Sequence, residues 1–143
     1  MELVSIGMVH SPYRDKSAAP FQGRYSEERA ALEIYPQFVD ALKDIDKAEY
    51  LIVFYWCHQA QRDILQTKTP HGPDVRGVFA CRSPNRPNPI AFCAAKLLGR
   101  EGNRLLVQGV DAVDGSPLLD IKPYSSKLDS IENVPFRGDK FAK

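Results

Sequence analysis

The sequence lacks a long apolar run, a signal segment and any marked excess of charge. Its longest apolar run, residues 50–57, is far too short to cross a bilayer, and the N-terminus has no basic region followed by an apolar core. The formal net charge is only +1, so a nucleic-acid partner would need a local basic patch. Three cysteines without framework spacing suit a reducing compartment. We therefore expect a cytoplasmic protein with no membrane segment.

Several common catalytic and cofactor motifs are also missing. There is no G-x-G-x-x-G after a predicted strand and no Walker A pattern, so neither common type of nucleotide site is supported. The absence of a G-x-S-x-G elbow argues against a serine hydrolase. No C-x-x-C or H-x-x-x-H pair is present, and the adjacent Cys57 and His58 would face opposite sides of a strand. We expect no metal site.

Short segments of strand-like composition dominate what remains, without internal repeats or strand–helix–strand alternation. Strands are predicted over residues 3–9, 31–35, 50–57, 76–80, 90–98, 104–110 and 118–121, with the central one, 50–57, buried. One short helix is predicted from Pro36, ending before Ala48, with long loops over residues 13–28 and 61–74. The 143 residues suffice for one domain with its own core. The sequence predicts an all-β, single β-barrel domain over residues 1–143.

The most distinctive stretch is the proline-rich segment, residues 81–90, which reads C-R-S-P-N-R-P-N-P-I. Its three prolines fix their own φ angles and push the residues before them towards extended geometry. A polyproline II run would place one residue in three on each ridge: Arg82, Asn85 and Asn88 on a polar ridge, and Pro84, Pro87 and Ile90 on an apolar ridge suited to packing. Such a rigid rod suits a preformed polar ligand site, and a solvated surface loop is the alternative.

Other polar residues stand at the ends of predicted strands. His58 and Gln59 follow the 50–57 run, where a capped strand end is the ordinary explanation. Residues 114–117, D-G-S-P, form a turn that is either a ligand-holding turn or a simple hairpin. In the D-I-K-P-Y run, alternation puts Asp120, Lys122 and Tyr124 on one face, opposite Ile121. An Asp–Lys pair there is more often a rim salt bridge than a catalytic pair.

Together these motifs resemble the TsaA-like or TrmO family. The resemblance rests on residues 77–90 (G-V-F-A-C-R-S-P-N-R-P-N-P-I) and 114–124 (D-G-S-P-L-L-D-I-K-P-Y), with 6–13 (I-G-M-V-H-S-P-Y) and 54–59 (F-Y-W-C-H-Q). It implies a β-barrel methyltransferase that uses S-adenosylmethionine, forms a homodimer and methylates N6 of threonylcarbamoyl-adenosine beside the tRNA anticodon. This chain departs from the fuller pattern in having no C-terminal extension of the longer relatives, and in the A-F-C-A-A run at residues 91–95.

The resemblance also implies site residues. The implied cofactor contacts are Phe21, Gln22, His58, Gln59, Arg82, Phe92, Asp114, Gly115, Ser116, Pro117, Asp120, Lys122 and Pro123. Asn85, Arg86 and Asn88 are assigned to the methyl acceptor.

The chemistry of the residues agrees with these assignments and leaves alternatives open. Arg82 or Arg86 can bind a carboxylate with a two-pronged guanidinium, and Asp114 or Asp120 can accept from ribose or ammonium groups. An amide-like N6 is a poor nucleophile, so a base must help, and Tyr124, His58 and Asp120 are the candidates. A methyltransferase with a different small-molecule or RNA acceptor, or a non-catalytic domain that binds S-adenosylmethionine, remains possible.

Overall fold

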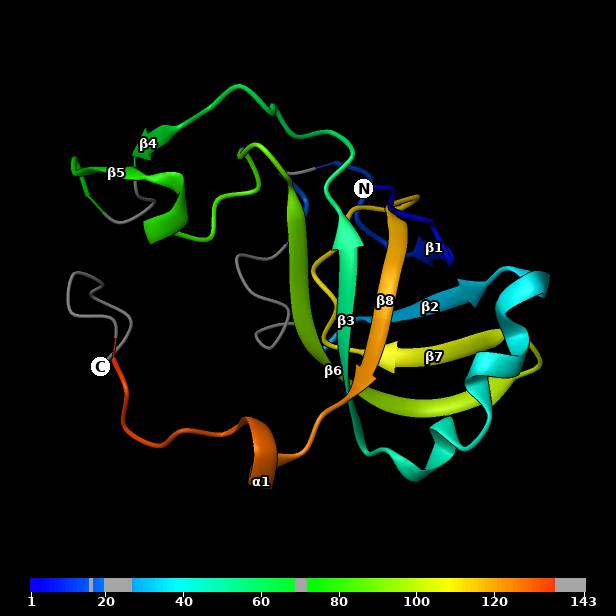
Figure 1. Cartoon of the computed structure of the whole chain (residues 1–143). Helices are drawn as coiled ribbons and strands as arrows, with labels where there is room; N and C mark the ends of the chain where they lie inside the picture. The colour runs from blue at the N-terminus through cyan, green and yellow to red at the C-terminus, as the bar shows by residue number, and fades with distance from the viewer. Residues whose placement is uncertain (16, 20–26, 69–71, 136–143) are drawn as a thin grey trace.

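β-Strands are the main regular structure of this computed structural model, which describes residues 1–15, 17–19, 27–68 and 72–135 (Figure 1). The strands are β1 (Gly7–His10), β2 (Arg29–Ile34), β3 (Tyr50–Trp56), β4 (Gln66–Lys68), β5 (Val75–Gly77), β6 (Ile90–Glu101), β7 (Arg104–Gln108) and β8 (Pro117–Pro123). The helical turns are the 3-10 segments η2 (Pro36–Leu42), η3 (Ile45–Lys47) and η4 (Val78–Ala80) and the α-helical turn α1 (Ser126–Asp129). Within the described ranges, no helix is both long and apolar enough to cross a membrane.

Six strands close into a barrel in the order β1-β2-β7-β6-β3-β8. Neighbouring strands are antiparallel, and β8 returns to β1 through the pairs Gly7–Leu118 and Met8–Pro117. The long strand β6 pairs with β3 along residues 90–96 and with β7 along residues 96–101, with a register shift between Leu97 and Gly99. The predicted all-β barrel is therefore confirmed.

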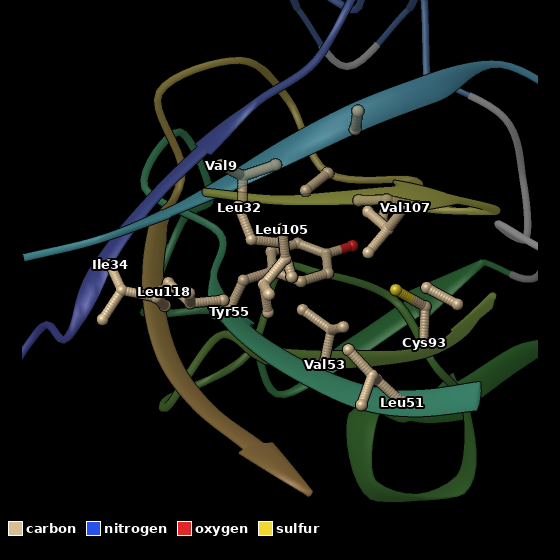
Figure 2. Close-up of a cluster of buried hydrophobic side chains, with 14 of the residues drawn as sticks. Val9, Leu32, Ile34, Leu51, Val53, Tyr55, Cys93, Leu105, Val107 and Leu118 are labelled. Carbon is tan, nitrogen blue, oxygen red and sulfur yellow. The ribbon is translucent and has the colours of Figure 1, made fainter. Parts of the chain in front are cut away.

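Alternate residues of each strand fill the barrel interior (Figure 2). On β3, Leu51 and Val53 are fully buried and Tyr55 is 6% exposed. Burying each such aliphatic side chain contributes about 1.5–3 kcal/mol. The outward-facing residues of β3 differ, since Tyr50 is 40% exposed and Phe54 is half-buried. The prediction that the whole 50–57 strand is buried is therefore wrong for its outward face. In a barrel made of a single sheet, only one face of each strand points into the interior.

Two predicted boundaries near the N-terminal half are corrected. The first strand begins at Gly7 rather than residue 3, and Leu3 and Val4, which pair with none of the described strands, are exposed. The predicted helix begins at Pro36 as expected but consists of the two 3-10 segments η2 and η3. Only Leu42 of these segments is buried, so the apolar side is too narrow to hold a full α-helix against the barrel.

The predicted loop over residues 61–74 contains a strand. β4 pairs with β5 in a separate two-stranded ribbon that, with η4, makes an arm projecting from the barrel (Figure 1). The strand predicted over residues 76–80 ends at Gly77, where the chain turns into η4. The pairing partner of β4 lies across a proline-containing loop, so local composition does not reveal it.

Tyr55 carries a polar group into the barrel, where its hydroxyl donates to Asp111 Oδ1 at 2.6 Å. Burial, followed by the nearby Asp111 charge, raises the pKa of Tyr55. The same two causes raise the pKa of the buried Cys93 thiol to about 12. Both groups therefore stay neutral at physiological pH, and the Tyr55 hydroxyl remains a donor to the carboxylate.

The close approach of β1 to β2 gives a first prediction. A Cβ on Gly7 would overlap the backbone carbonyl oxygen of Glu33, so Gly7→Ala should lower the free energy of unfolding by about 1–3 kcal/mol or more. Gly99→Ala is the matched control, because it also lies in a strand but has no heavy atom within 4 Å of the added Cβ. Urea unfolding measures both; equal losses would contradict the prediction.

The interior hydrogen bond gives a second prediction. Tyr55→Phe removes the donor to Asp111, which should cost about 1–3 kcal/mol of unfolding free energy because the carboxylate loses a partner. Tyr35→Phe is the control, since the half-buried Tyr35 hydroxyl bonds to none of the described residues. An unchanged urea midpoint for Tyr55→Phe would show that water replaces the phenol without cost.

Candidate functional site

Polar segments far apart in sequence gather at one end of the barrel. There β1 and β3 finish and β6 and β8 begin. We call this the loop end, defined by residues 57–59 after β3, 81–89 before β6 and 109–116 between β7 and β8. Because antiparallel neighbours bring the end of one strand beside the start of the next, most of the predicted site residues meet here.

The predicted Asp114–Gly115 turn is present and holds β1 in place. Gly115 has a φ of 84°, which favours glycine, and its N–H donates to the Val9 carbonyl at 2.8 Å. Asp114 Oδ1 accepts from the Ser11 N–H at 3.0 Å. The turn thus has a structural role, and its proposed contact with a ligand stays a prediction.

His58 and Gln59 form an exposed turn directly after β3. Within the described ranges neither side chain has a hydrogen bond or ion pair. The preceding Cys57 N–H donates to the Pro89 carbonyl at 2.8 Å. This bond fixes the turn beside the proline-rich segment and keeps the imidazole and amide available to a ligand.

The proline-rich segment is anchored to residues 61 and 62 rather than by the predicted apolar ridge. Asn85 Oδ1 accepts from the Gln61 N–H at 2.9 Å, and Arg62 Nε donates to the Pro87 carbonyl at 2.8 Å. The ridge prediction is wrong: Pro84 and Ile90 are exposed, Pro87 is half-buried, and Pro89 is the buried proline. The hydrogen bonds donated by Arg62, which we call the Arg62 clamp, anchor the segment in place of the predicted packing of an apolar ridge.

The residues assigned to the methyl acceptor also make contacts within the chain. Arg86 Nη1 donates to the carbonyls of Cys81 and Ser83 at 3.0 and 3.2 Å. Asn88 Oδ1 accepts from Arg62 Nη2 at 3.3 Å. These contacts hold the segment rigid, and acceptor binding by Asn85, Arg86 and Asn88 stays a prediction.

Arg82 differs from Arg86 in making no hydrogen bond or ion pair with the described residues. Its guanidinium carbon lies 5.0 Å from the centre of the Phe92 ring, on the outer face of β6. Phe92 is 47% exposed, and its ring centroid is 6.2 Å from that of Phe54 on β3. A cation is therefore poised above an exposed pair of aromatic rings.

The outer face of β8 continues this surface. Asp120 lies opposite Phe54 in the register, and its carboxylate pairs with Lys122 Nζ at 3.1 Å. Ile121 packs against the core, which confirms the predicted alternation. Both charged groups are exposed, so the pair is a surface salt bridge worth little on its own.

The three candidate bases are not gathered in one place. His58 lies at the loop end, Asp120 part-way along β8, and Tyr124 just beyond its opposite end. Seven residues from Pro117 to Tyr124 span about 23 Å at about 3.3 Å per residue. Phe21 and Gln22 lie outside the described residues, and Pro123 is exposed next to Tyr124.

Sequence reasoning missed three residues at or near this site. Phe54 lies on the outer face of β3, which the uniformly apolar 50–57 run does not distinguish from the inner face. Arg62 and the Tyr55 partner Asp111 carry no local signal, because their partners lie far away in the sequence. In the part of the chain that the structure describes, no group of three or more His, Cys, Asp or Glu side chains is placed to hold a metal ion.

Comparisons with known proteins agree with this architecture. The family model described as the tRNA-methyltransferase O N-terminal domain matches residues 8–130. An Archaeoglobus fulgidus protein named as a probable S-adenosyl-L-methionine-binding protein is 51% identical over 94% of this chain, which spans 37% of that relative. A second protein of that organism, named as an S-adenosyl-L-methionine-binding protein, is 42% identical, with 94% of this chain and 96% of that protein covered.

A solved structure is similar along the same length. The crystal structure of TrmO from Pseudomonas aeruginosa has a TM-score of 0.79 and 31% identity, covering 94% of this chain and 60% of that chain. The family match and the relatives cover most of the described barrel, including the proline-rich segment and β8. This chain therefore belongs to the TrmO family, through its tRNA-methyltransferase O N-terminal domain.

Proposed function

We propose that this chain binds S-adenosylmethionine at the loop end and transfers its methyl group to N6 of threonylcarbamoyl-adenosine in tRNA. The observation that carries the proposal is Arg82, whose guanidinium makes no hydrogen bond or ion pair with the described residues and lies 5.0 Å from the centre of the exposed Phe92 ring. A guanidinium binds a carboxylate with paired donors, and aromatic rings offer a flat surface to adenine. Family membership supports the same ligand, because several relatives are named as proteins that bind it.

The residues around Arg82 would complete the ligand site. His58 and Gln59 offer hydrogen-bonding groups at the neighbouring turn, and the Asp114 turn offers backbone groups and a carboxylate for hydroxyl or ammonium groups. When bound, S-adenosylmethionine supplies a methyl group on an electrophilic sulfonium. The protein would mainly hold the acceptor nitrogen in line with it, an effect that can reach about 7–11 kcal/mol.

The acceptor nitrogen must lose its proton as the new N–C bond forms. Of the three candidate bases, His58 is the one at the loop end, and its exposed imidazole has no hydrogen-bond or ion-pair partner among the described residues. We therefore assign the base to His58 ahead of Asp120, whose carboxylate is already engaged by Lys122, and of Tyr124 at the opposite end.

A second function has a specific observation in its favour. The relative that this chain matches over 96% of its length is named only as an S-adenosyl-L-methionine-binding protein. A domain that binds the cofactor without transferring its methyl group would need the same Arg82 and Phe92 surface. The two functions differ in whether S-adenosylhomocysteine is released when an acceptor is added.

Labelled methyl transfer tests the proposed reaction. The protein is incubated with isotopically labelled S-adenosylmethionine and tRNA that carries unmethylated threonylcarbamoyl-adenosine, and the nucleosides are examined by mass spectrometry. We expect the label on that nucleoside. In a separate calorimetric titration, Arg82→Ala should bind the cofactor more weakly than the wild type, by about tenfold or more. Arg104→Ala is the control, because Arg104 is an exposed arginine beside Glu101, at the other end of β6 from Arg82.

The outcomes separate the possible functions. Cofactor binding without label on any nucleoside would favour the binding protein. Label on another nucleoside would support a methyltransferase that acts on a different acceptor. Unchanged affinity in Arg82→Ala would remove Arg82 from the site.

We also propose that the chain forms a homodimer through the arm. Its exposed apolar side chains are Leu65 at 67%, Val75 at 56% and Phe79 at 84%. Apolar groups gathered on a projecting segment are typical of an interaction surface. A second copy is the partner that the family resemblance implies.

Light scattering tests the dimer. Phe79→Asp should convert a dimer to a monomer, because a carboxylate would be buried at the contact. Leu106→Asp is the control, since Leu106 is a 39% exposed residue on β7 rather than on the arm. A wild-type chain that is monomeric at micromolar concentration would exclude the dimer, and a Phe79→Asp dimer would exclude the arm as its contact.

A further inference from the structure

A groove lies on the outer face of the barrel at the end opposite the loop end. It has a volume of about 370 Å³ and is lined by Glu49, Tyr50, Tyr124, Ser125 and Ser126. Tyr50 is 40% exposed and Tyr124 is 36% exposed. The groove therefore presents two aromatic side chains from different strands to solvent.

Backbone pairing fixes the two tyrosines relative to each other. The Tyr124 N–H donates to the Tyr50 carbonyl at 2.9 Å, continuing the β3–β8 register beyond the Leu51–Pro123 pair. Directly opposite residues in an antiparallel pair point to the same face. The rings nevertheless make no ring contact with each other or with other described aromatic residues. The space between them is the groove.

The other walls are also held in place. The Glu49 carbonyl accepts from the Leu97 N–H at 3.0 Å, and the Ser125 N–H donates to Asp129 Oδ2 at 2.9 Å. These bonds hold one wall to β6 and the other to α1. A site built this way needs little ordering when a ligand enters.

The polar groups in the groove have no partners in the described part of the chain. Neither tyrosine hydroxyl, the Glu49 carboxylate nor the two serine hydroxyls takes part in a hydrogen bond or ion pair there. The groove thus combines flat apolar surfaces with a carboxylate acceptor and four hydroxyls. A purely apolar partner would bury these groups without hydrogen bonds, at a cost.

Two lysines flank the groove on the same outer face. Lys96 lies opposite Tyr50 in the β3–β6 register, and Lys122 lies two residues before Tyr124. Both are exposed. Aromatic side chains beside lysines are typical of surfaces that stack the bases and pair the phosphates of a single-stranded nucleic acid.

We propose that this groove stacks an unpaired base of an RNA strand against Tyr50 and Tyr124. Glu49 would accept a hydrogen bond from an amino or imino N–H of the base, and Lys96 would pair with a phosphate. This inference rests on the proposed function, since the strand would be the methyl acceptor. The groove lies four residues along β3 from Phe54, which is about 13 Å at about 3.3 Å per residue. That separation places the groove beside the cofactor surface as a second, distinct contact with the RNA.

A stacking probe tests the groove separately from methyl transfer. The full chain is titrated into a seven-nucleotide unstructured RNA with 2-aminopurine at its centre, whose fluorescence falls when the base stacks. We expect quenching by the wild type, and about 5- to 100-fold weaker binding for Tyr50→Ala, because each base–aromatic stack contributes that much. Tyr50→Phe keeps the ring and should bind like the wild type.

Two further variants separate stacking from folding. Glu49→Gln, which keeps the shape of the groove, should change the preference among bases rather than the quenching. Leu106→Ala, an exposed residue of β7 that does not line the groove, should leave RNA binding unchanged. Thermal melting and calorimetry with S-adenosylmethionine check that Tyr50→Ala is folded and still binds its cofactor.

Each result supports or overturns the inference independently of the reaction. Quenching that needs Tyr50, with cofactor binding intact, supports the groove even if no methyl group is transferred. Labelled tRNA without any Tyr50-dependent quenching would support the proposed function and overturn the inference that an RNA base stacks in the groove. A Tyr50→Ala variant that changes the oligomeric state and leaves RNA binding unchanged would assign the groove to a second copy of the chain, and would also overturn it.

Discussion

The pairing of β1 with β8 closes the barrel, and the candidate site depends on it. The Ile6 N–H donates to the Leu118 carbonyl at 2.8 Å, and the Val9 N–H donates to the Ser116 carbonyl at 2.9 Å. These bonds join residues more than 100 positions apart in the chain. Because the ring is closed, its strands have no free edge, and the segments at its loop end start from fixed points. The Asp114 turn is tied to β1 through this closure, and the pairing of β3 with β8 sets it beside the His58 turn.

A barrel made of one sheet has a second consequence, which concerns its outer face. The interior takes the aliphatic half of each strand, so the aromatic residues of the other half remain outside. Phe54 and Phe92 lie beneath Arg82, and Tyr50 and Tyr124 flank the groove. The same alternation that builds the core therefore places two separate aromatic pairs on the outer face, beside basic and acidic side chains.

Part of the candidate site could be predicted from the sequence because its signals are local. An Asp-Gly pair favours a tight turn, and Gly115 adopts the expected positive φ. Prolines stiffen the segment around Arg82 whatever surrounds it. Other features could not be predicted. The Arg62 clamp and the Tyr55–Asp111 bond join residues 25 and 56 positions apart, and no residue pattern announces such pairs. The prediction of an apolar ridge in the proline-rich segment was wrong for the same reason, because residues distant in the sequence decide which proline is buried.

The sequence by itself determined the approximate positions of the six barrel strands, the turn residues and which side chains share a face. These properties follow from φ preferences and from the two-residue period of a strand, and both act over a few residues. Only the tertiary structure decided which strand ends meet, that His58 and Tyr124 lie at opposite ends, and that one face of the 50–57 run is open to solvent. The two-residue period fixes the face of a strand on which a residue lies. Which residues become its neighbours on adjacent strands depends on closure of the barrel, which joins β1 near the start of the chain to β8 near its end.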